Sequence, residues 1–410
     1  MKFILKKQSE EGCLKTKRAL FWINILNEPL SALYTLLPFI LVKDLHATAL
    51  QISLFVSLRP LLSVFSFYWG PSSKETSNKL IYNVMGACVL TYLPFLFFAM
   101  SGNVWLILFS AGFYQLFHKA GLPAWIEILQ RNIPKKPRED IFSLSYLLSF
   151  VESGLLGLFV GYLLDLDPAL FRILLVAASL LGLCGLFFLK GLPLSSCEDI
   201  SIPRVKEGIL RPLKEGFSLV QSRRDFKIFQ MAFTIGGAAL MLMAPVLPIF
   251  YASTLSISHS TITIARFVFM ALGVICSSFF WKQLLIKKNM NELTGWILLG
   301  FGVFPFLLLV AQFSIGMLYA AFFIYGIAQA GSHLVWNLSG PFFAQGQNSA
   351  LFTRVNLLML GLRGMIFPFL GGILCQGYGQ QTVICIGMLA CFGGTYVISR
   401  MVKQPAPAAK

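Results

Sequence analysis

The chain is poor in charged residues. Of its 410 residues only 12% are Asp, Glu, Lys or Arg, about half the share usual in soluble domains. The apolar share is 57% and the mean hydropathy is +0.75. A soluble protein of this size has no core large enough to bury so many apolar side chains, and a chain this apolar is neither disordered nor collagen-like. The composition therefore predicts a polytopic membrane protein.

Motifs for catalysis and for cofactors are missing as well. The sequence contains no His-Glu-x-x-His, no Gly-x-Ser-x-Gly, no P-loop and no Gly-x-Gly-x-x-Gly after a strand. The eight cysteines form no Cys-x-x-Cys pair, and six of them lie in apolar segments, which favours reduced core residues. We therefore expect a protein that is not an enzyme and that holds no cofactor and no metal. A pump driven by ATP is disfavoured for the same reason.

Long apolar runs are abundant instead. A membrane-spanning helix needs about 20 mostly apolar residues, and the sequence offers twelve such segments. They cover residues 19–42, 48–69, 80–100, 103–127, 141–164, 168–190, 226–251, 260–285, 292–312, 314–338, 350–374 and 380–400. The expected fold is an all-α polytopic membrane protein with twelve transmembrane helices.

The basic residues indicate the orientation of these spans. The N-terminus and every second connection carry 27 of the 33 Lys and Arg residues, whereas the alternate connections carry only Lys43. Cytoplasmic loops are the ones enriched in Lys and Arg, so both termini are predicted to be cytoplasmic in the cell (inner) membrane. The net charge of +16 is then a topology signal that also attracts membrane lipids, and no nucleic-acid partner is expected.

The two halves of the chain partly repeat each other at an offset of 210–212 residues. Matches recur at five successive spans, for example Ser66–Trp69 with Ser278–Trp281 and Pro94–Leu96 with Pro305–Leu307. We therefore predict two parallel six-helix repeats. The predicted domains are a cytoplasmic tail at 1–18, an N-terminal bundle at 19–190, a linker with an amphipathic helix at 191–225, a C-terminal bundle at 226–400 and a tail at 401–410.

Twelve spans in two sets of six, cytoplasmic ends and a long middle connection resemble the major facilitator superfamily (MFS). Residues Pro134–Arg138 are similar to the family's Pro-x-x-x-Arg loop after span 4, and Phe367–Gly372 is close to an antiporter pattern, although it lies in span 11. The loop after span 2 departs from the family, because Lys74 stands where an Asp is expected. The resemblance implies a monomeric secondary transporter for a small-molecule substrate, in which spans 3, 6, 9 and 12 are peripheral.

Ionisable residues inside spans are costly and are by default functional candidates. They avoid spans 3, 6, 9 and 12, if Arg172 is taken as interfacial, and polar faces accompany them on spans 1, 4 and 10. The predicted substrate and ion pathway consists of Glu28, Arg59, Lys119, Glu152, Arg363, Asn24, Asn27, Gln329 and His333. Arg266 and His118 are further ionisable residues within spans.

Each polar face has a structural alternative, in which its side chains only join helices by hydrogen bonds. Glu28 has one too, an ion pair with Arg59 or Lys119. Arg363 is flanked by Gly361 and Gly364, which would admit a ligand or a backbone.

Four deep bases stand against two deep acids, which favours an organic anion or a zwitterion as substrate. The resemblance implies transport by alternating access, and we expect coupling to protons. The alternatives are a multidrug exporter on the same fold and, less favoured, a lipid-handling membrane protein without transport activity.

Overall fold

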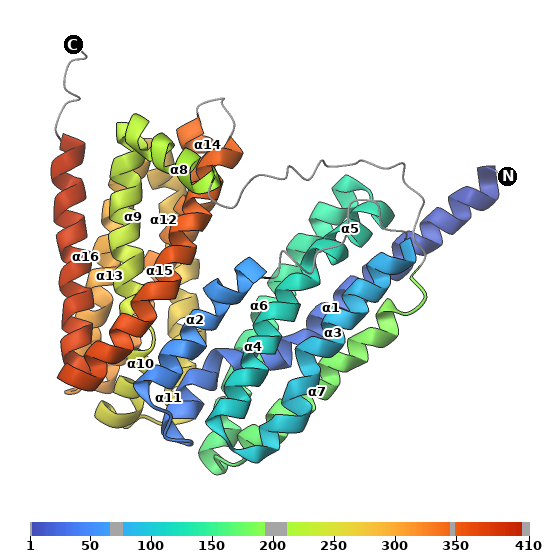
Figure 1. Cartoon of the computed structure of the whole chain (residues 1–410), viewed down its shortest axis with the longest axis horizontal. Helices are drawn as coiled ribbons and strands as arrows, with labels where there is room; N and C mark the ends of the chain where they lie inside the picture. The colour runs from blue at the N-terminus through green and yellow to red at the C-terminus, as the bar shows by residue number, and fades with distance from the viewer. Residues whose placement is uncertain (1, 66–76, 193–210, 345–348, 404–410) are drawn as a thin grey trace. The chain divides into compact units, whose positions relative to one another are not determined.

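The described part of the chain is helical throughout. The computed structural model describes residues 2–65, 77–192, 211–344 and 349–403, and within these ranges it contains no β-strand (Figure 1). Its longer helices are α1 (Lys2–Lys43), α2 (Ala49–Phe65), α3 (Ser77–Phe98), α4 (Val104–Ala120), α5 (Leu122–Asn132), α6 (Lys135–Leu166), α7 (Leu170–Leu189), α8 (Arg211–Ser222), α9 (Arg224–Met243), α12 (Met270–Lys287), α13 (Met290–Val310), α14 (Ile315–Ala344), α15 (Ser349–Tyr378) and α16 (Gln380–Lys403). Short helical elements join some of them: η2 (Ala99–Ser101), α10 (Val246–Ile249), η3 (Phe250–Thr254), α11 (His259–Thr263) and η4 (Ile264–Phe269).

The chain divides into two compact units. Unit 1 comprises residues 1–47 and 58–205, and unit 2 comprises residues 48–57 and 206–410, so the division falls within α2. The expected domain boundaries at 190 and 226 stay a prediction.

Unit 1 is built around α1, which packs against α6 and α7, while α3 packs against α4 and α7 (Figure 1). At one end of the unit a fully buried apolar cluster includes Leu20, Leu80, Ile128 and Leu189. These residues come from four helices far apart in sequence, and their burial holds the ends of those helices together.

Unit 2 has an aromatic core. Phe226 and Phe229 of α9 pack on Phe343 of α14, and Phe226 also packs on Phe352 of α15, with ring centroids 4.9–6.2 Å apart within this group. α13 packs against α14 and α16, and α9 packs against α15 and α16. Large rings at these contacts contribute apolar burial and edge-to-face attraction together.

Each of the twelve predicted spans is mainly helical where the structure describes it. Ten helices in the described residues are long and apolar enough to cross a membrane. The two predicted spans outside that set are 48–69, where α2 is described only to Phe65, and 103–127. The latter is not one helix: it divides into α4 and α5 at Gly121, because Pro123 sits in the first turn of a new helix.

The helix order repeats as expected. α4 begins at Val104 and α14 at Ile315, an offset of 211, and α7 and α16 begin at Leu170 and Gln380, an offset of 210. Helix α8 lies in the middle connection, where the sequence predicts an amphipathic helix, and the first part of that connection lies outside the described residues. The role of α8 as a surface helix stays a prediction.

The outer side chains suit a lipid environment. Phe97, Phe187 and Phe313 are 68%, 78% and 88% exposed, and such exposure of large rings is costly in water but not in hydrocarbon.

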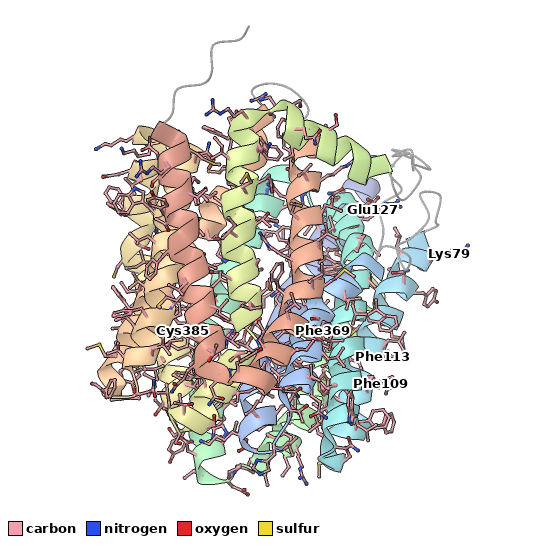
Figure 2. All side chains as sticks on the ribbon, turned by 60° about the vertical axis from the view of Figure 1, so that its left-hand side comes forward. Lys79, Phe109, Phe113, Glu127, Phe369 and Cys385 are labelled. Carbon is pink, nitrogen blue, oxygen red and sulfur yellow. The ribbon has the colours of Figure 1, made fainter. Side chains whose placement is uncertain are left out.

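Figure 2 shows Phe109 and Phe113 projecting from neighbouring turns of α4, with ring centroids 4.6 Å apart. Lys79 lies toward the end of unit 1 that also carries Glu127 (Figure 2).

Candidate functional site

The first group of polar side chains lies inside unit 1, on the face of α1 that carries Asn24, Asn27 and Glu28. All three side chains are half-buried. The Glu28 carboxylate accepts hydrogen bonds from the hydroxyls of Ser149 and Ser153, one turn apart on α6. This pairing of spans 1 and 5 gives the carboxylate two neutral partners in an otherwise apolar bundle.

Asn27 is held by a tyrosine from a third helix. The phenol of Tyr92 on α3 donates a hydrogen bond to Asn27 Oδ1 at 2.6 Å. The Tyr92 ring lies directly against Gly182 of α7, where a Cβ atom would collide with it. Gly182 is therefore required for the close approach that places the Tyr92 hydroxyl on α1.

Stacked rings extend the group along α4. Tyr34 of α1 stacks on Tyr114 with centroids 4.8 Å apart, and Tyr114 stacks on His118 at 5.5 Å. Tyr34 also hydrogen-bonds Gln115, and Tyr114 hydrogen-bonds Ser31. The stack and its hydrogen bonds therefore join α1 to α4.

The two bases of unit 1 lie near this stack. Arg59 of α2 is close enough to interact electrostatically with Tyr34, Tyr114 and Lys119. Arg59 is solvent-exposed and Lys119 is half-buried. Two basic side chains, Arg59 and Lys119, therefore lie near the stacked aromatic rings.

The charged side chains of this group are not paired with each other. No ion pair joins Glu28 to Arg59 or Lys119, all three of which are described, so the ion-pair alternative for Glu28 does not hold in this conformation. Glu152 lies on α6 between the two serines and interacts electrostatically with Glu28. Unit 1 thus brings together the predicted residues Asn27, Glu28, Arg59, Lys119 and Glu152.

Arg363 of α15 is the central polar residue of unit 2. Its side chain is only 5% exposed, and its guanidinium lies over the ring of Phe233 at 4.8 Å. Nη1 donates a hydrogen bond to the Phe233 backbone oxygen at 2.7 Å, while the buried Nε has no hydrogen-bond partner among the described residues. No carboxylate among the described residues forms an ion pair with Arg363.

The space for this guanidinium comes from a glycine on the facing helix. A Cβ atom at Gly237 of α9 would collide with Arg363 Cζ, Nη1 and Nε. Gly361, one of the two glycines that flank Arg363 in the sequence, has no atom of the described residues within 4 Å of the position of its absent Cβ. The expectation that Gly361 and Gly364 admit a ligand or a backbone stays a prediction.

A buried amide network lies two turns from Arg363. Gln230 of α9 donates to Asn356 Oδ1, and Asn356 Nδ2 donates to Ser339 Oγ of α14 at 2.8 Å. Gln230 and Asn356 are 1% and 3% exposed. Asn356 precedes Arg363 by seven residues, so both lie on one face of α15.

The remaining predicted residues of unit 2 lie on α14 and η4. Gln329 Nε2 and His333 Nε2 are 3.2 Å apart on α14, and His333 is exposed. Arg266 in η4 is exposed and interacts electrostatically with Tyr251 and Tyr325. In the described residues, neither the Gln329–His333 pair nor Arg266 forms a hydrogen bond with Arg363.

The sequence model of the Major Facilitator Superfamily matches residues 29–362. The chain belongs to the Major Facilitator Superfamily. It is thus a multi-pass integral membrane transport protein, as the resemblance implied. A search for similar curated proteins gave no match.

Solved MFS-fold structures superpose over nearly the whole chain. A mutant form of the nucleoside transporter NupG is 16% identical with a TM-score of 0.69, covering 95% of this chain and 100% of NupG. A POT family transporter in complex with 5-aminolevulinic acid is 14% identical with a TM-score of 0.70, covering 94% and 96%. A bacterial homologue of the human lysosomal transporter Spinster is 13% identical with a TM-score of 0.63, covering 97% and 99%. At these identities the likeness shows the fold.

Several site residues carry weak sequence signals. Gln230 and Asn356 are neutral amides and were missed, although an amide within an apolar span is itself a signal. Ser149 and Ser153 are sequence neighbours of Glu152, and the structure joins them to Glu28 instead. Gly237 could not be singled out among 34 glycines.

Proposed function

We propose that this MFS protein is a secondary active transporter that carries a small organic anion or zwitterion by alternating access, coupled to protons. The observation that carries the proposal is the Arg363 guanidinium, which is buried, lacks a carboxylate in the described part of the chain and keeps Nε unbonded. A buried cation without a counter-charge is costly, and an anionic group supplied by a substrate offsets that cost. A planar guanidinium also suits carboxylate or phosphate, which it binds with two hydrogen bonds.

The proton-linked residue in this proposal is Glu28. Its two serine partners support the role, because a hydroxyl donates to an ionised carboxylate and accepts from a protonated one. The carboxylate can therefore gain or lose a proton while both hydrogen bonds are kept. Glu152 of α6, beside the same serines, is the second candidate.

A multidrug exporter is the second candidate function. A carboxylate near stacked aromatic rings favours a lipophilic cation, and Glu28 lies close enough to Tyr114 to interact with it. Arg59 and Lys119 beside the same rings oppose that reading, since they repel a cation. The binding test described below therefore includes organic cations as the alternative class of ligand.

A binding screen of the purified protein tests the substrate class. Thermal unfolding is followed with carboxylates, phosphates, zwitterionic amino acids and peptides, and organic cations, and dissociation constants are then measured for the stabilising class. We expect stabilisation by anions or zwitterions. Arg363→Gln should weaken binding by about 2–5 kcal/mol, or roughly 30- to several-thousand-fold, because it removes one partner of a desolvated charge pair.

The matched control is Arg172→Gln. Arg172 also lies over a ring, that of Phe171 at 5.6 Å, but on α7, which the resemblance places at the periphery. Its loss should leave the dissociation constant unchanged. Stabilisation by cations alone, or equal loss of binding in both variants, contradicts an anion site at Arg363.

The remaining properties complete the proposal. The protein is a monomer in the cell (inner) membrane with both termini in the cytoplasm, and it transports its substrate without chemical change. The concentration of Lys and Arg in alternate connections supports the orientation.

A further inference from the structure

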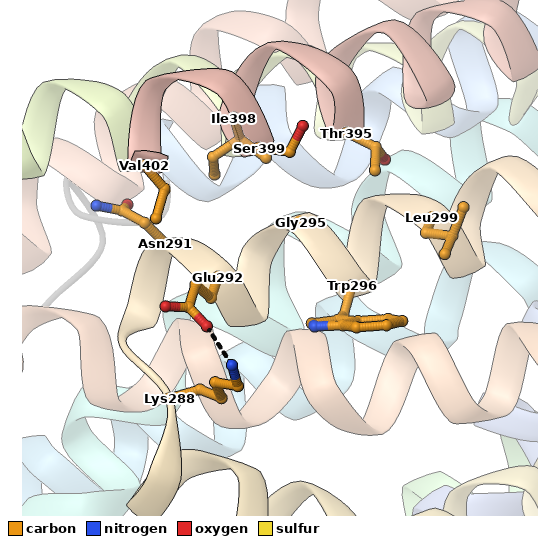
Figure 3. Close-up of a pocket in the computed structure, with 10 residues that line it drawn as sticks. All are labelled: Lys288, Asn291, Glu292, Gly295, Trp296, Leu299, Thr395, Ile398, Ser399 and Val402. Atoms are coloured by element: carbon orange, nitrogen blue, oxygen red, sulfur yellow. Dashed lines mark ion pairs between the residues drawn. The ribbon is translucent and has the colours of Figure 1, made fainter. Parts of the chain in front are cut away.

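Two cavities adjoin each other along one side of unit 2. The larger, about 460 Å³, lies between α13 and α16 and includes Lys288, Glu292, Trp296 and Ser399 in its lining (Figure 3). The smaller, about 220 Å³, lies between α12, α13 and α14. Trp296 and Leu299 line both cavities, so the two adjoin at these side chains.

The two cavities differ in chemistry along α13. The first is polar where α13 begins, with Lys288 and Glu292, and is apolar farther along, at Leu299. The second has no charged residue in its lining, and Leu284 and Ile324 are among the apolar residues that line it. An amphiphile with its polar group at the start of α13 would fit this gradient.

The two adjoining cavities together form one groove along α13, and the length of this groove matches one leaflet of a bilayer. From Asn291 to Val303, the ends of the lined stretch of α13, twelve residues rise about 18 Å. Half of a hydrocarbon core is about 15 Å thick. Trp296, 57% exposed, lies about one turn below the charged end, the depth at which tryptophan is enriched in membrane proteins.

The polar end is electrically balanced. Lys288 Nζ and Glu292 Oε2 are 3.0 Å apart, and the other lining groups at this end are neutral, among them Asn291 and Ser399. The end therefore offers one cation and one anion side by side, which together match a zwitterion that carries a phosphate and an ammonium.

We propose that the groove of α13 and α16 binds one phospholipid with a phosphoethanolamine headgroup. The phosphate lies at Lys288 and at the start of α13, because the N-terminal end of a helix dipole attracts anions. The primary ammonium lies at Glu292, and an acyl chain follows α13 past Trp296 into the smaller cavity. A choline headgroup has no N–H to donate, and a glycerol headgroup leaves Glu292 facing a net negative lipid, so both bind less well.

Native mass spectrometry of the purified full-length protein tests the site. The protein is mixed with equal amounts of ethanolamine, choline and glycerol phospholipids that have identical acyl chains, and the retained lipid is identified. The unaltered protein should retain chiefly one ethanolamine phospholipid. Glu292→Gln should reduce the ethanolamine preference about tenfold, as expected for one lost charge-assisted contact.

Glu292→Gln is a conservative test. A glutamine at this position keeps the cap at the start of α13, where Asn289 accepts from the backbone N–H of residue 292 at 2.9 Å. The matched control is Glu127→Gln, which breaks the similar ion pair of Glu127 with Arg131, 2.7 Å apart on α5 and outside both cavities. This control should retain ethanolamine lipid as the unaltered protein does.

Two further variants distinguish the contribution of the lipid headgroup to binding from that of the acyl chain. Lys288→Gln should lower retention of all three phospholipids, because each carries the phosphate, and Leu299→Trp should do so by filling the groove where the cavities meet. Equal retention of the three headgroups by the unaltered protein, a preference for the glycerol phospholipid, or an ethanolamine preference that survives Glu292→Gln overturns the proposal.

Discussion

Replacing Gly237 with alanine displaces Arg363 without changing any charge. The new methyl group would occupy the space of the guanidinium, which must then move off the Phe233 ring and away from the Phe233 carbonyl oxygen, 2.7 Å from Nη1. Overpacking of a fitted contact costs about 1–3 kcal/mol. A hydrogen bond from a charged donor contributes a similar amount, and the two losses overlap because one movement causes both.

The helix itself favours the substitution. Alanine stabilises a helix interior by about 0.5–1 kcal/mol relative to glycine. Subtracting this gain from the overpacking cost leaves an expected net loss of about 0–2.5 kcal/mol in the free energy of unfolding. The same movement takes Arg363 out of its binding position, so affinity for the anionic substrate should also fall, while cations that do not use Arg363 should be unaffected.

Denaturant unfolding in detergent and ligand titration measure the two effects on one sample. Gly361→Ala is the control, since it lies on α15 two residues before Arg363 and its Cβ would meet no atom within 4 Å. This control should be neutral or slightly stabilised. If Gly237→Ala were as stable and bound substrate as tightly as Gly361→Ala, the packing of Arg363 against α9 would be refuted.

Three further perturbations test other parts of the account. Glu28→Gln should abolish accumulation driven by a pH gradient while exchange of solute persists, and normal gradient-driven uptake by a stable variant would exclude the proton role. Asn356→Leu should lower the free energy of unfolding by about 1–3 kcal/mol, because Gln230 loses its acceptor, and pairing it with Gln230→Met should recover most of the loss in the same unfolding assay. In a cysteine-free background, Ser101→Cys should react with an impermeant thiol reagent from outside and Ser222→Cys should not, whereas the reverse labelling would contradict the orientation.

The spans could be predicted because membrane thickness sets the length of an apolar run and the repeat offset aligns one half with the other. The break at Gly121 was not expected, although Pro123 marks it. Proline alone is a poor guide, since α3 continues through Pro94 and α13 through Pro305. Neighbouring helices in a bundle compensate for the lost hydrogen bond, and this context is not visible in the sequence.

The sequence supplies a set of candidate residues, which stays a prediction, but it does not supply their contacts. Burial of a charge is unfavourable wherever it occurs, so Glu28 and Arg363 stand out in apolar spans. Their partners depend on how helices face each other across long separations. Arg363 meets Phe233, 130 residues earlier, and Glu28 meets serines on α6 rather than the bases on α2 and α4. No local sequence pattern predicts which residues Arg363 and Glu28 contact.

Uptake into proteoliposomes measures the central claim most directly. The purified protein is reconstituted, an inward proton gradient is imposed, and accumulation of the anion or zwitterion that binds most tightly is followed with and without a protonophore. The account predicts accumulation above equilibrium that collapses with the protonophore and is lost in Arg363→Gln but kept in Arg172→Gln. Accumulation of organic cations alone, or accumulation that does not depend on Arg363, would contradict it.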